Sequence, residues 1–326
     1  MNTIKSSKGF DWLLVVLVNF FWATQVPVIR LIGDRLGPVT VAYVPTVLST
    51  VLLIPFLLYI NKKHKRKIHW RWNDLKYFII PGLIGIFIMQ YAFTLGSQHT
   101  LAANAGIIVL TIPVIVAILS TFMLKEKLNV IRIISFILAI CGVLLTSMSD
   151  IAGASFKQSE YLVGNLIFLF ACFCCGYYNT YVKKLVDKGY SEFEILVYCS
   201  SVGSIASIPV LIWVEPFSIS SFLASGPVAV WGVIELTLFV YSISWLLFLY
   251  VLKRMDVSQA ILGNYLMPFF IALLGIFLLG EKITPLMMIG GLIILLSTLM
   301  VTVFETRLLK LINKRKIQGK TEIEQI

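Results

Sequence analysis

The sequence predicts an all-α polytopic membrane protein with ten transmembrane helices, arranged as two inverted five-helix repeats with both termini in the cytoplasm. Three observations lead to this prediction. The composition is 59% hydrophobic and 13% charged, with a mean hydropathy of +0.91, whereas soluble domains are roughly half apolar and a quarter charged. The other two observations are an internal repeat and a one-sided distribution of Lys and Arg.

The repeat relates residues 105–127 to residues 260–282 at a constant offset of 155 (260 − 105 and 282 − 127). Identical residues recur without a gap, so that Ala105, Pro113, Ala117, Leu119, Phe122, Leu124, Glu126 and Lys127 return as Ala260, Pro268, Ala272, Leu274, Phe277, Leu279, Glu281 and Lys282. Internal repeats in an apolar chain are typical of transporters. We assign residues 1–150 to the first repeat, 151–309 to the second and 310–326 to a basic cytoplasmic tail.

Ten apolar runs of roughly 20 residues follow one another along the chain, each long enough to cross a hydrocarbon core of about 30 Å. They begin near Trp12, Val39, Leu75, Leu101, Val130, Tyr161, Phe193, Val228, Val257 and Pro285. The first run is too long for a signal-peptide core, so we expect it to be retained. Because segments of alternating hydrophobicity are missing from the sequence, helices are the predicted spanning structure.

The positions of the 27 Lys and Arg residues predict the orientation, since basic loops stay on the cytoplasmic side. With both termini inside, 23 of them lie on the inner side and only Arg30, Arg35, Lys157 and Lys282 lie outside. Five helices per repeat then give the two repeats opposite orientations, which permits alternating access to a shared site near the midplane. This arrangement fits the plasma membrane, and contact with anionic lipid accounts for the net charge of +11 without a nucleic-acid partner.

The cysteines and histidines do not predict metal chemistry. All five cysteines fall within predicted spans and all three histidines fall in predicted loops, a pattern unlike a disulfide framework or spaced zinc ligands. The sequence also has no glycine-rich phosphate loop, GxSxG or HExxH motif. We therefore predict no metal, no cofactor and no enzymatic activity.

Glu235 is the main candidate for a binding group. It lies about seven residues into the eighth predicted span, where an ionised carboxylate facing lipid costs at least about 2.5 to 3.5 kcal/mol. At 100° per residue, Trp231, Phe239 and Ser242 share its face and Trp245 lies at the edge. An anion between aromatic rings suits an ammonium group, which gains roughly 0.5 to 2 kcal/mol per cation–π contact. The alternative is a structural acid that accepts hydrogen bonds from a neighbouring helix.

Other polar or aromatic residues at similar depth are candidate substrate ligands, because buried polar groups need partners. They are Trp22, Gln25, Gln90, Asn104, Tyr178, Asn264 and Tyr265. Pro268 has no N–H and therefore frees the carbonyl of Asn264 in a continuous helix. Pro27, Pro113 and Pro268 are predicted kink or hinge points. Glu126 and Glu281 lie at helix ends beside Lys, and we expect mirrored terminal ion pairs with a structural or gating role.

A family resemblance rests on segments concentrated in the second repeat. They are Lys253-Arg254-Met255-Asp256-Val257-Ser258-Gln259-Ala260, Met267-Pro268, Leu279-Gly280-Glu281-Lys282-Ile283-Thr284-Pro285 and Gly290-Gly291. The first half matches more loosely, through Phe21-Trp22-Ala23, Tyr91-Ala92-Phe93, Pro113, Glu126 and Gly142. The chain resembles the EamA-like branch of the drug/metabolite transporter superfamily. This resemblance implies a ten-helix bacterial plasma-membrane carrier of amino acids, amines or small metabolites, often an exporter.

One departure concerns the residue before Pro268, where members of that branch often have Glu and this chain has Met267. The equivalent residue of the first half, Ile112, is also apolar, so ion coupling through that glutamate cannot be carried over.

The predicted function is a secondary transporter that exports a small organic cation or zwitterion by alternating access. Glu235 is the predicted counter-ion, and protons are a possible coupling ion. A carrier of phosphorylated solutes or sugars is the first alternative, but phosphate recognition calls for Lys or Arg near the midplane. An intramembrane enzyme would need several reactive groups within reach of one another, and a scaffold would need no polar midplane. The sequence leaves the oligomeric state open.

Overall fold

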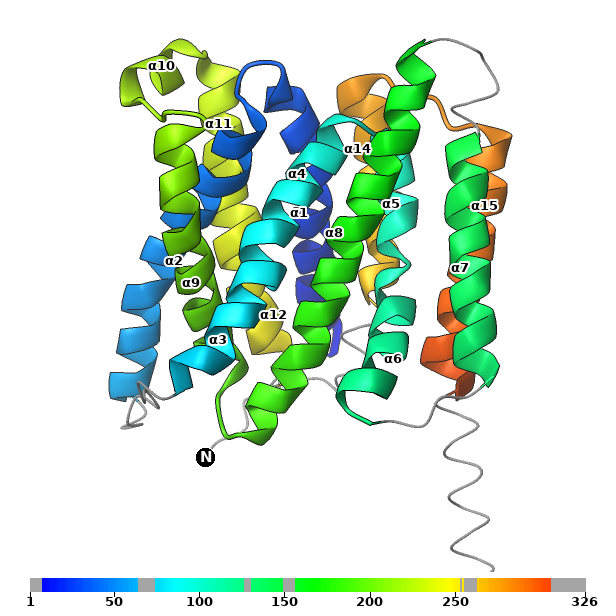
Figure 1. The fold of residues 1–326 in the computed structure, drawn as a ribbon, viewed down its shortest axis with the longest axis horizontal. Helices are drawn as coiled ribbons and strands as arrows, with labels where there is room; N and C mark the ends of the chain where they lie inside the picture. Colours follow the sequence, from blue (N-terminus) through cyan, green and yellow to red (C-terminus); the bar gives the residue numbers. More distant parts are fainter. Residues whose placement is uncertain are drawn as a thin grey trace, which may run out of the picture.

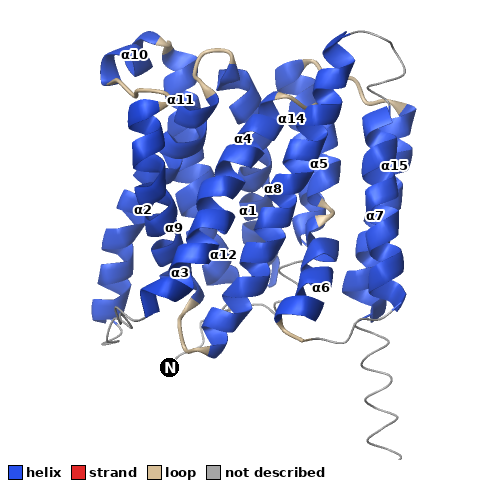
Figure 2. Ribbon diagram, in the orientation of Figure 1, coloured by secondary structure: helices blue, strands red, loops and turns tan. Residues whose placement is uncertain are grey.

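The computed structural model describes residues 8–63, 74–125, 130–148, 156–252, 254 and 263–305. In these residues the chain forms helices and no strands, and the helices stand side by side in one bundle (Figures 1 and 2). The first described helix begins and the last one ends at the same, lower end of the bundle in Figure 1. The predicted tail 310–326, Glu126 and the predicted start near Val257 lie outside the described residues.

The described residues of the first half form eight helical segments. They are α1 (Lys8–Gly33), α2 (Pro38–Lys63), α3 (Leu75–Gly82), the π-helix η2 (Leu83–Ile88), α4 (Met89–Gln98), α5 (Ala102–Val109), α6 (Ile112–Met123) and α7 (Val130–Met148). Segments α3, η2 and α4 follow one another without a gap and form one rod, and α5 and α6 are separated by two residues.

Within its described residues, the second half follows a similar order, with a short helix after the second helix and a π-helix at the end in addition. Its segments are α8 (Phe156–Asp187), α9 (Glu192–Trp213), α10 (Ile219–Ala224), α11 (Pro227–Glu235), the π-helix η3 (Leu236–Ile243), α12 (Ser244–Leu252), the 3₁₀-helix η4 (Gly263–Leu266), α14 (Met267–Leu279), α15 (Pro285–Leu299) and the π-helix η5 (Met300–Glu305). Segments α11, η3 and α12 again form one rod, and η4 leads directly into α14.

Seven helical stretches within the described residues are long and apolar enough to cross a membrane, and three further apolar helices are shorter. The shorter ones cover 130–146, 264–279 and 285–299, where the fifth, ninth and tenth spans were predicted. The prediction of an all-helical membrane protein is confirmed for the described part of the chain. The count of ten spanning helices and the cytoplasmic position of the termini stay predictions.

The surface supports a membrane environment. Large apolar side chains are exposed over most of the bundle, and Trp213, Phe277 and Phe122 expose 80%, 77% and 72% of their surface. Soluble monomers rarely expose contiguous apolar patches of more than a few hundred Å². Lipid is the solvent that makes such a surface favourable.

Backbone geometry repeats at the offset found in the sequence. Pro113 lies in the first turn of α6 and Pro268 in the first turn of α14, 155 residues later (268 − 113). The turns that follow these helices contain left-handed residues at the same offset, Lys125 with φ 57° and Gly280 with φ 66° (280 − 125). The two prolines were predicted to kink continuous helices. Each lies in the first turn of a helix that directly follows an irregular segment, Leu110-Thr111 or the 3₁₀-helix η4, and there the missing N–H has no hydrogen bond to lose.

Small residues allow the closest helix contacts. A β carbon on Gly142 would lie 2.8 Å from the Gly290 carbonyl oxygen, and one on Gly290 would lie 2.7 Å from the Gly142 oxygen, so α7 and α15 touch through their backbones. This pair forms one edge of the bundle, and α2 and α9 lie at the opposite edge (Figure 1). Between them, a buried core that includes Ile108, Phe168 and Ile271 packs α5, α8 and α14 together.

Candidate functional site

A cluster of polar side chains joins α1, α2, α4 and η3 in the interior of the bundle. Gln25 Nε2 donates to the Tyr241 hydroxyl oxygen at 3.0 Å, and the Gln90 side chain lies beside the same hydroxyl. Gln90 Nε2 also lies 3.5 Å from Thr46 Oγ1. We call this group, with Ser49 and Ser242, the interior polar cluster: Gln25, Thr46, Ser49, Gln90, Tyr241 and Ser242. Its amides and hydroxyls can both donate and accept hydrogen bonds.

The π-helix η3 brings Tyr241 and Ser242 into this cluster. The Ser242 hydroxyl donates to the Thr237 carbonyl oxygen five residues earlier at 2.7 Å and lies 3.0 Å from Ser49 Oγ. The Ser49 hydroxyl donates to the Tyr241 carbonyl oxygen at 2.9 Å. The first-half π-helix η2 ends at Ile88 and η3 ends at Ile243, again 155 residues apart (243 − 88). Both halves therefore have a π-helix at equivalent positions. π-Helical segments are frequent at functional sites.

Glu235 is the last residue of α11 and is half-buried against α1. Its Oε1 atom accepts a hydrogen bond from the Thr24 hydroxyl, and its Oε2 atom is buried without a hydrogen-bond partner. Gly232, one turn earlier, allows the close approach of α1, because a β carbon there would lie 2.5 Å from Ile32 Cγ2. The carboxylate is therefore only half satisfied.

A groove of about 350 Å³ lies between α1 and α11, and Glu235 is one of the residues that line it. Its walls are Val28, Leu31, Pro227, Val228, Trp231 and Gly232. Trp231 exposes 68% of its surface and Leu31 exposes 40%. Glu235 is the one charged residue among those that line the groove.

The expected stripe of Glu235 with Trp231, Phe239, Ser242 and Trp245 is split in two. Trp231 and Phe239 lie on the exposed side of the rod with Glu235, whereas Ser242 is buried in the interior polar cluster. The physical reason is η3, because each residue of a π-helix turns through a smaller angle than the 100° that the prediction assumed. Glu235 is half-buried, since its Oε1 atom meets Thr24 of α1 and its Oε2 atom is buried, while the residue also lines the groove.

Two predicted aromatic residues pack beside the interior polar cluster. The Trp22 ring lies 5.4 Å from the Trp245 ring and 5.1 Å from the Phe248 ring, both edge-on. On α1, Trp22 lies three residues before Gln25. Trp245, on α12, lies three residues after Ser242 of η3. The structure therefore brings Trp22, Gln25, Gln90, Ser242 and Trp245 into one region.

The remaining predicted ligands lie elsewhere. Asn104 is fully buried in α5, and Tyr178 packs in an apolar cluster with Phe78 and Ile86. Asn264 and Tyr265 lie in η4, where Asn264 Oδ1 is buried without a partner and Tyr265 packs against the central core. Within the described residues, no group of three His, Cys, Asp or Glu side chains is placed to hold a metal ion.

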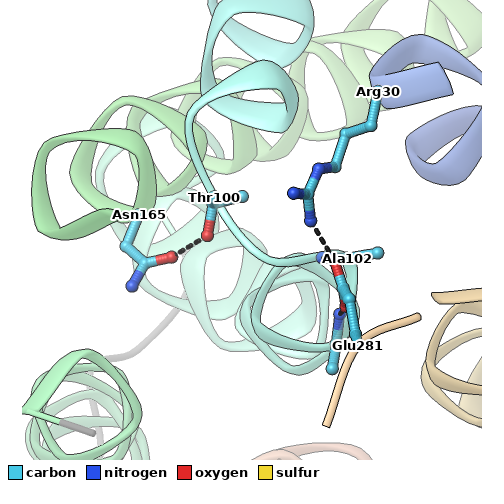
Figure 3. Close-up of polar contacts among 6 residues, drawn as sticks. Arg30, Thr100, Ala102, Asn165 and Glu281 are labelled. Atoms are coloured by element: carbon cyan, nitrogen blue, oxygen red, sulfur yellow. Dashed lines mark hydrogen bonds and ion pairs between the residues drawn. The ribbon is translucent and has the colours of Figure 1, made fainter. Parts of the chain in front are cut away.

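Glu281 holds three parts of the chain together at the upper end of the bundle (Figure 3). Its Oε1 atom accepts hydrogen bonds from Arg30 Nη1 and, at 2.8 Å, from the Ala102 amide, and its Oε2 atom accepts from the Ala103 amide at 3.1 Å. We call these four residues the upper lock. The amides belong to the first turn of α5, where the helix dipole also favours a negative charge. The left-handed Gly280 turns the chain from α14 toward them.

The upper lock changes one prediction. Glu281 does form an ion pair at a helix end, but its partner is Arg30, 251 residues away, and not the adjacent Lys282. A further contact fixes the same loop, since the Thr100 hydroxyl donates to Asn165 Oδ1 on α8 (Figure 3). Pro27 lies inside α1, one turn before Arg30.

A different ion pair lies after α12. Arg254 Nε donates to Asp11 Oδ1 of α1 at 2.8 Å, and Arg254 Nη1 donates to the Tyr250 hydroxyl at 2.9 Å. The hydrogen bond to Asp11 raises the pKa of the Arg254 guanidinium, so this cation is charged at every physiological pH. It connects α12 to the start of α1.

Comparison with known proteins places the chain among transporters. The model of the EamA-like transporter family matches it twice, over residues 10–148 and 162–303. An uncharacterized transporter of Archaeoglobus fulgidus is 23% identical over 88% of this chain and 96% of its own length. A protein of Streptantibioticus cattleyicolor named "Probable terminal-alkyne amino-acid exporter" is 24% identical over 88% of this chain and 91% of its own length. A solved crystal structure shares the fold, with a TM-score of 0.59 and 17% identity over 93% of this chain and 99% of that one.

Proposed function

Because the chain belongs to the EamA-like transporter family, we propose that it is a secondary transporter of a small organic cation or zwitterion, such as an amine or an amino acid. The observation that carries this proposal is Glu235, a carboxylate within a predicted span that has one engaged and one unpartnered oxygen. A buried charge is strongly unfavourable unless it is paired. An ammonium group would supply the missing partner.

The interior polar cluster suits the other groups of such a solute. Gln25 and Gln90 have N–H donors that can bind a carboxylate, and Tyr241 has a hydroxyl between them. Trp22 and Trp245 present aromatic surface beside these donors. An amino acid would place its ammonium group toward Glu235 and its carboxylate toward the amides. The amino-acid exporter among the relatives supports this substrate class and the outward direction.

The surroundings of Thr24 favour a role for protons. Its hydroxyl has one proton but two acceptors within reach, the Phe21 carbonyl oxygen at 2.7 Å and Glu235 Oε1. The hydroxyl can donate to Glu235 when this acid is ionised, and when Glu235 is protonated the acid can donate to Thr24 Oγ1 while the Thr24 hydroxyl donates to Phe21. A solute cation would displace this proton, so one carboxyl group would bind the cation and the proton in turn. We propose that this exchange couples export of the solute to import of a proton.

Alternating access follows from two equivalent halves. The upper lock closes the upper end by joining α1, α5 and the chain after α14. In the sequence repeat Glu126 is the equivalent of Glu281, and we propose that it has the same role on the cytoplasmic side, which we assign from the distribution of Lys and Arg. When one end of the bundle opens, the ion pair at that end would break, and the opposite end would close. Exchange between the conformations of two inverted halves is the general mechanism of such carriers.

A carrier of phosphorylated solutes fits less well. Arg30 is the basic residue in the last turn of α1, and its guanidinium already donates to Glu281. Phosphate recognition calls for a cation that is free to form charge-assisted hydrogen bonds. The family and the names of the relatives describe transporters and not enzymes.

Transport in proteoliposomes tests the proposal. Purified protein would be reconstituted and screened for accumulation of labelled amino acids, amines and sugar phosphates, with and without a pH gradient. We expect gradient-driven accumulation of at least one amine or amino acid, and its loss in Glu235→Gln. Glu215→Gln, which alters a carboxylate outside the candidate site, is the matched control and should transport normally. Unchanged gradient-driven transport by Glu235→Gln, or accumulation of sugar phosphates alone, would overturn the proposal.

A further inference from the structure

The groove beside Glu235 opens on the outer surface of the bundle and not into the interior polar cluster. Its rim consists of exposed apolar side chains, with Trp231 at 68%, Leu31 at 40% and Val228 at 37% exposure. On α1, Phe20, Leu17 and Leu13 are also exposed, but Thr24 and Pro27, which lie between them and Leu31 on the same side, are not. In a membrane, an apolar face of this kind is in contact with lipid.

Glu235 is the one charged residue among those that line this apolar groove. Glu235 Oε2 is buried and has no hydrogen-bond partner, while Trp231 lies one turn before it on the same side of α11. Water entering an apolar groove would find few polar partners, whereas a ligand with an apolar body and one ammonium group would satisfy both parts. The volume of about 350 Å³ lies within the range of roughly 300 to 1,000 Å³ that is typical of small-molecule pockets.

We propose that this groove binds a primary amine with an apolar chain or ring, whose ammonium group pairs with Glu235 and whose apolar part lies between α1 and Trp231. The inference rests on the proposed function and narrows its substrate class to amphiphilic amines, including amino acids with apolar side chains. Such a ligand can reach Glu235 from the hydrocarbon region of the membrane. Gly232 keeps α1 and α11 close at the base of the groove, so the ligand remains on the lipid side until the helices move.

Binding of n-alkylamines to the purified protein in lipid nanodiscs tests this proposal. The probes are methylamine, butylamine and hexylamine, with hexanol and hexanoate as compounds that lack the positive charge. We expect affinity to rise by about fourfold per added methylene group, which corresponds to ~0.8 kcal/mol, until the groove is filled. Hexanol and hexanoate should bind at least about tenfold more weakly than hexylamine. These measurements on the unmodified protein do not depend on the folding of a variant.

Variants locate the site. Glu235→Gln should weaken hexylamine binding by about tenfold or more, and Trp231→Ala should weaken it by about threefold to tenfold while changing methylamine binding less. Trp213→Ala and Glu215→Gln are matched controls, because Trp213 is an exposed tryptophan on α9 and Glu215 caps a different helix. Both controls should bind hexylamine as the unmodified protein does.

Nanodiscs with and without phosphatidylethanolamine identify the source of the amine. If a lipid headgroup occupies the groove, hexylamine should bind more weakly when that lipid is present, and if the ligand is a free amine, its affinity should be equal in both membranes. Either result supports the groove as an amine site. Affinity that does not depend on chain length, or that Trp231→Ala leaves unchanged, would overturn the proposal. Charge-dependent binding of methylamine would then persist and leave the proposed function standing, whereas equal binding by Glu235→Gln would contradict both.

Discussion

Glu281 and Glu235 are carboxylates on the same half of the chain, and they differ in how many of their oxygen atoms have partners. Glu281 is buried, and both of its oxygens accept hydrogen bonds, from Arg30 and from two backbone amides of α5. Glu235 is half-buried, and only one of its oxygens has a partner. A fully paired acid stabilises one arrangement of helices, whereas a half-paired acid keeps a position for a ligand. We therefore propose that Glu281 stabilises the arrangement of the helices and that Glu235 binds the ligand.

A third carboxylate provides a reference for this comparison. Glu215 accepts hydrogen bonds from the amides of Val39 and Thr40 at 3.0 and 3.1 Å and so caps α2 as Glu281 caps α5. Among its described contacts are the two backbone amides of a helix cap, but no arginine of the kind that pairs with Glu281. The difference between the two caps isolates the contribution of Arg30.

Replacing Glu281 by Gln should produce the largest loss of stability. The amide can still accept from one backbone N–H, but Arg30 would keep a partly buried charge without its counter-ion, and breaking a buried pair in this way costs about 3 to 5 kcal/mol. The free energy of unfolding in bicelles, followed by helical circular dichroism, measures the effect. Glu215→Gln should cost only about 1 kcal/mol, the usual contribution of a cap. Equal losses in both variants would show that Arg30 contributes nothing.

A double-mutant cycle should then sharpen the result. Arg30→Gln combined with Glu281→Gln removes both charges, so the double variant should be more stable than the sum of the two single effects predicts, by about 2 kcal/mol. The measurement is the same unfolding experiment on the four proteins of the cycle. Additivity to within about 0.5 kcal/mol would mean that the two side chains are not coupled in the membrane.

The sequence predicts much of this fold because its signals are local. Runs of apolar residues identify the helices, and the recurrence from Ala105 to Lys127 in the second half relates the two repeats. The structure adds that the helix breaks before Pro113 and Pro268 and the left-handed residues Lys125 and Gly280 follow the same offset. Equal sequence at equal spacing thus produced equal backbone geometry.

The candidate site was harder to predict because it depends on tertiary contacts. In the π-helix η3, the Tyr241 carbonyl oxygen accepts a hydrogen bond from the Ser49 hydroxyl. The two residues are 192 positions apart in the sequence, so no local pattern predicts this contact. Angles calculated for an α-helix therefore placed Ser242 on the face of Glu235, whereas its hydroxyl lies against Ser49 on α2. Thr24 and Tyr241 were missed for the same reason, although Thr24 precedes the predicted ligand Gln25. For Glu281, Arg30 was a detectable partner, because it is one of only four basic residues on the predicted outer side.

Replacing Thr24 by Val should have an intermediate effect on stability. Valine keeps the shape of the side chain but leaves Glu235 Oε1 without its donor, and an unsatisfied buried acceptor costs about 1 to 3 kcal/mol. We expect a value near the lower limit, because the groove beside Glu235 is partly open. Thr180→Val is the matched control, since the buried Thr180 hydroxyl donates to the carbonyl of Gly176 in its own helix. A larger loss in the control than in Thr24→Val would contradict the assignment.

Replacing Glu235 by Gln should affect stability less than Glu281→Gln, Arg30→Gln or Thr24→Val, and it should have a large effect on transport. The amide oxygen can accept from Thr24, and the amide nitrogen takes the place of an oxygen that has no partner, so no hydrogen bond is lost. The free energy of unfolding should change by less than about 1 kcal/mol, and removal of an unpaired buried charge favours an increase. Transport by the same preparation, measured as counterflow of a labelled amine, should fall by about tenfold or more, the consequence of losing at least ~1.4 kcal/mol of binding. If Glu235→Gln instead destabilised the protein as much as Glu281→Gln, Glu235 would be a structural acid, and the contrast between the two carboxylates would disappear.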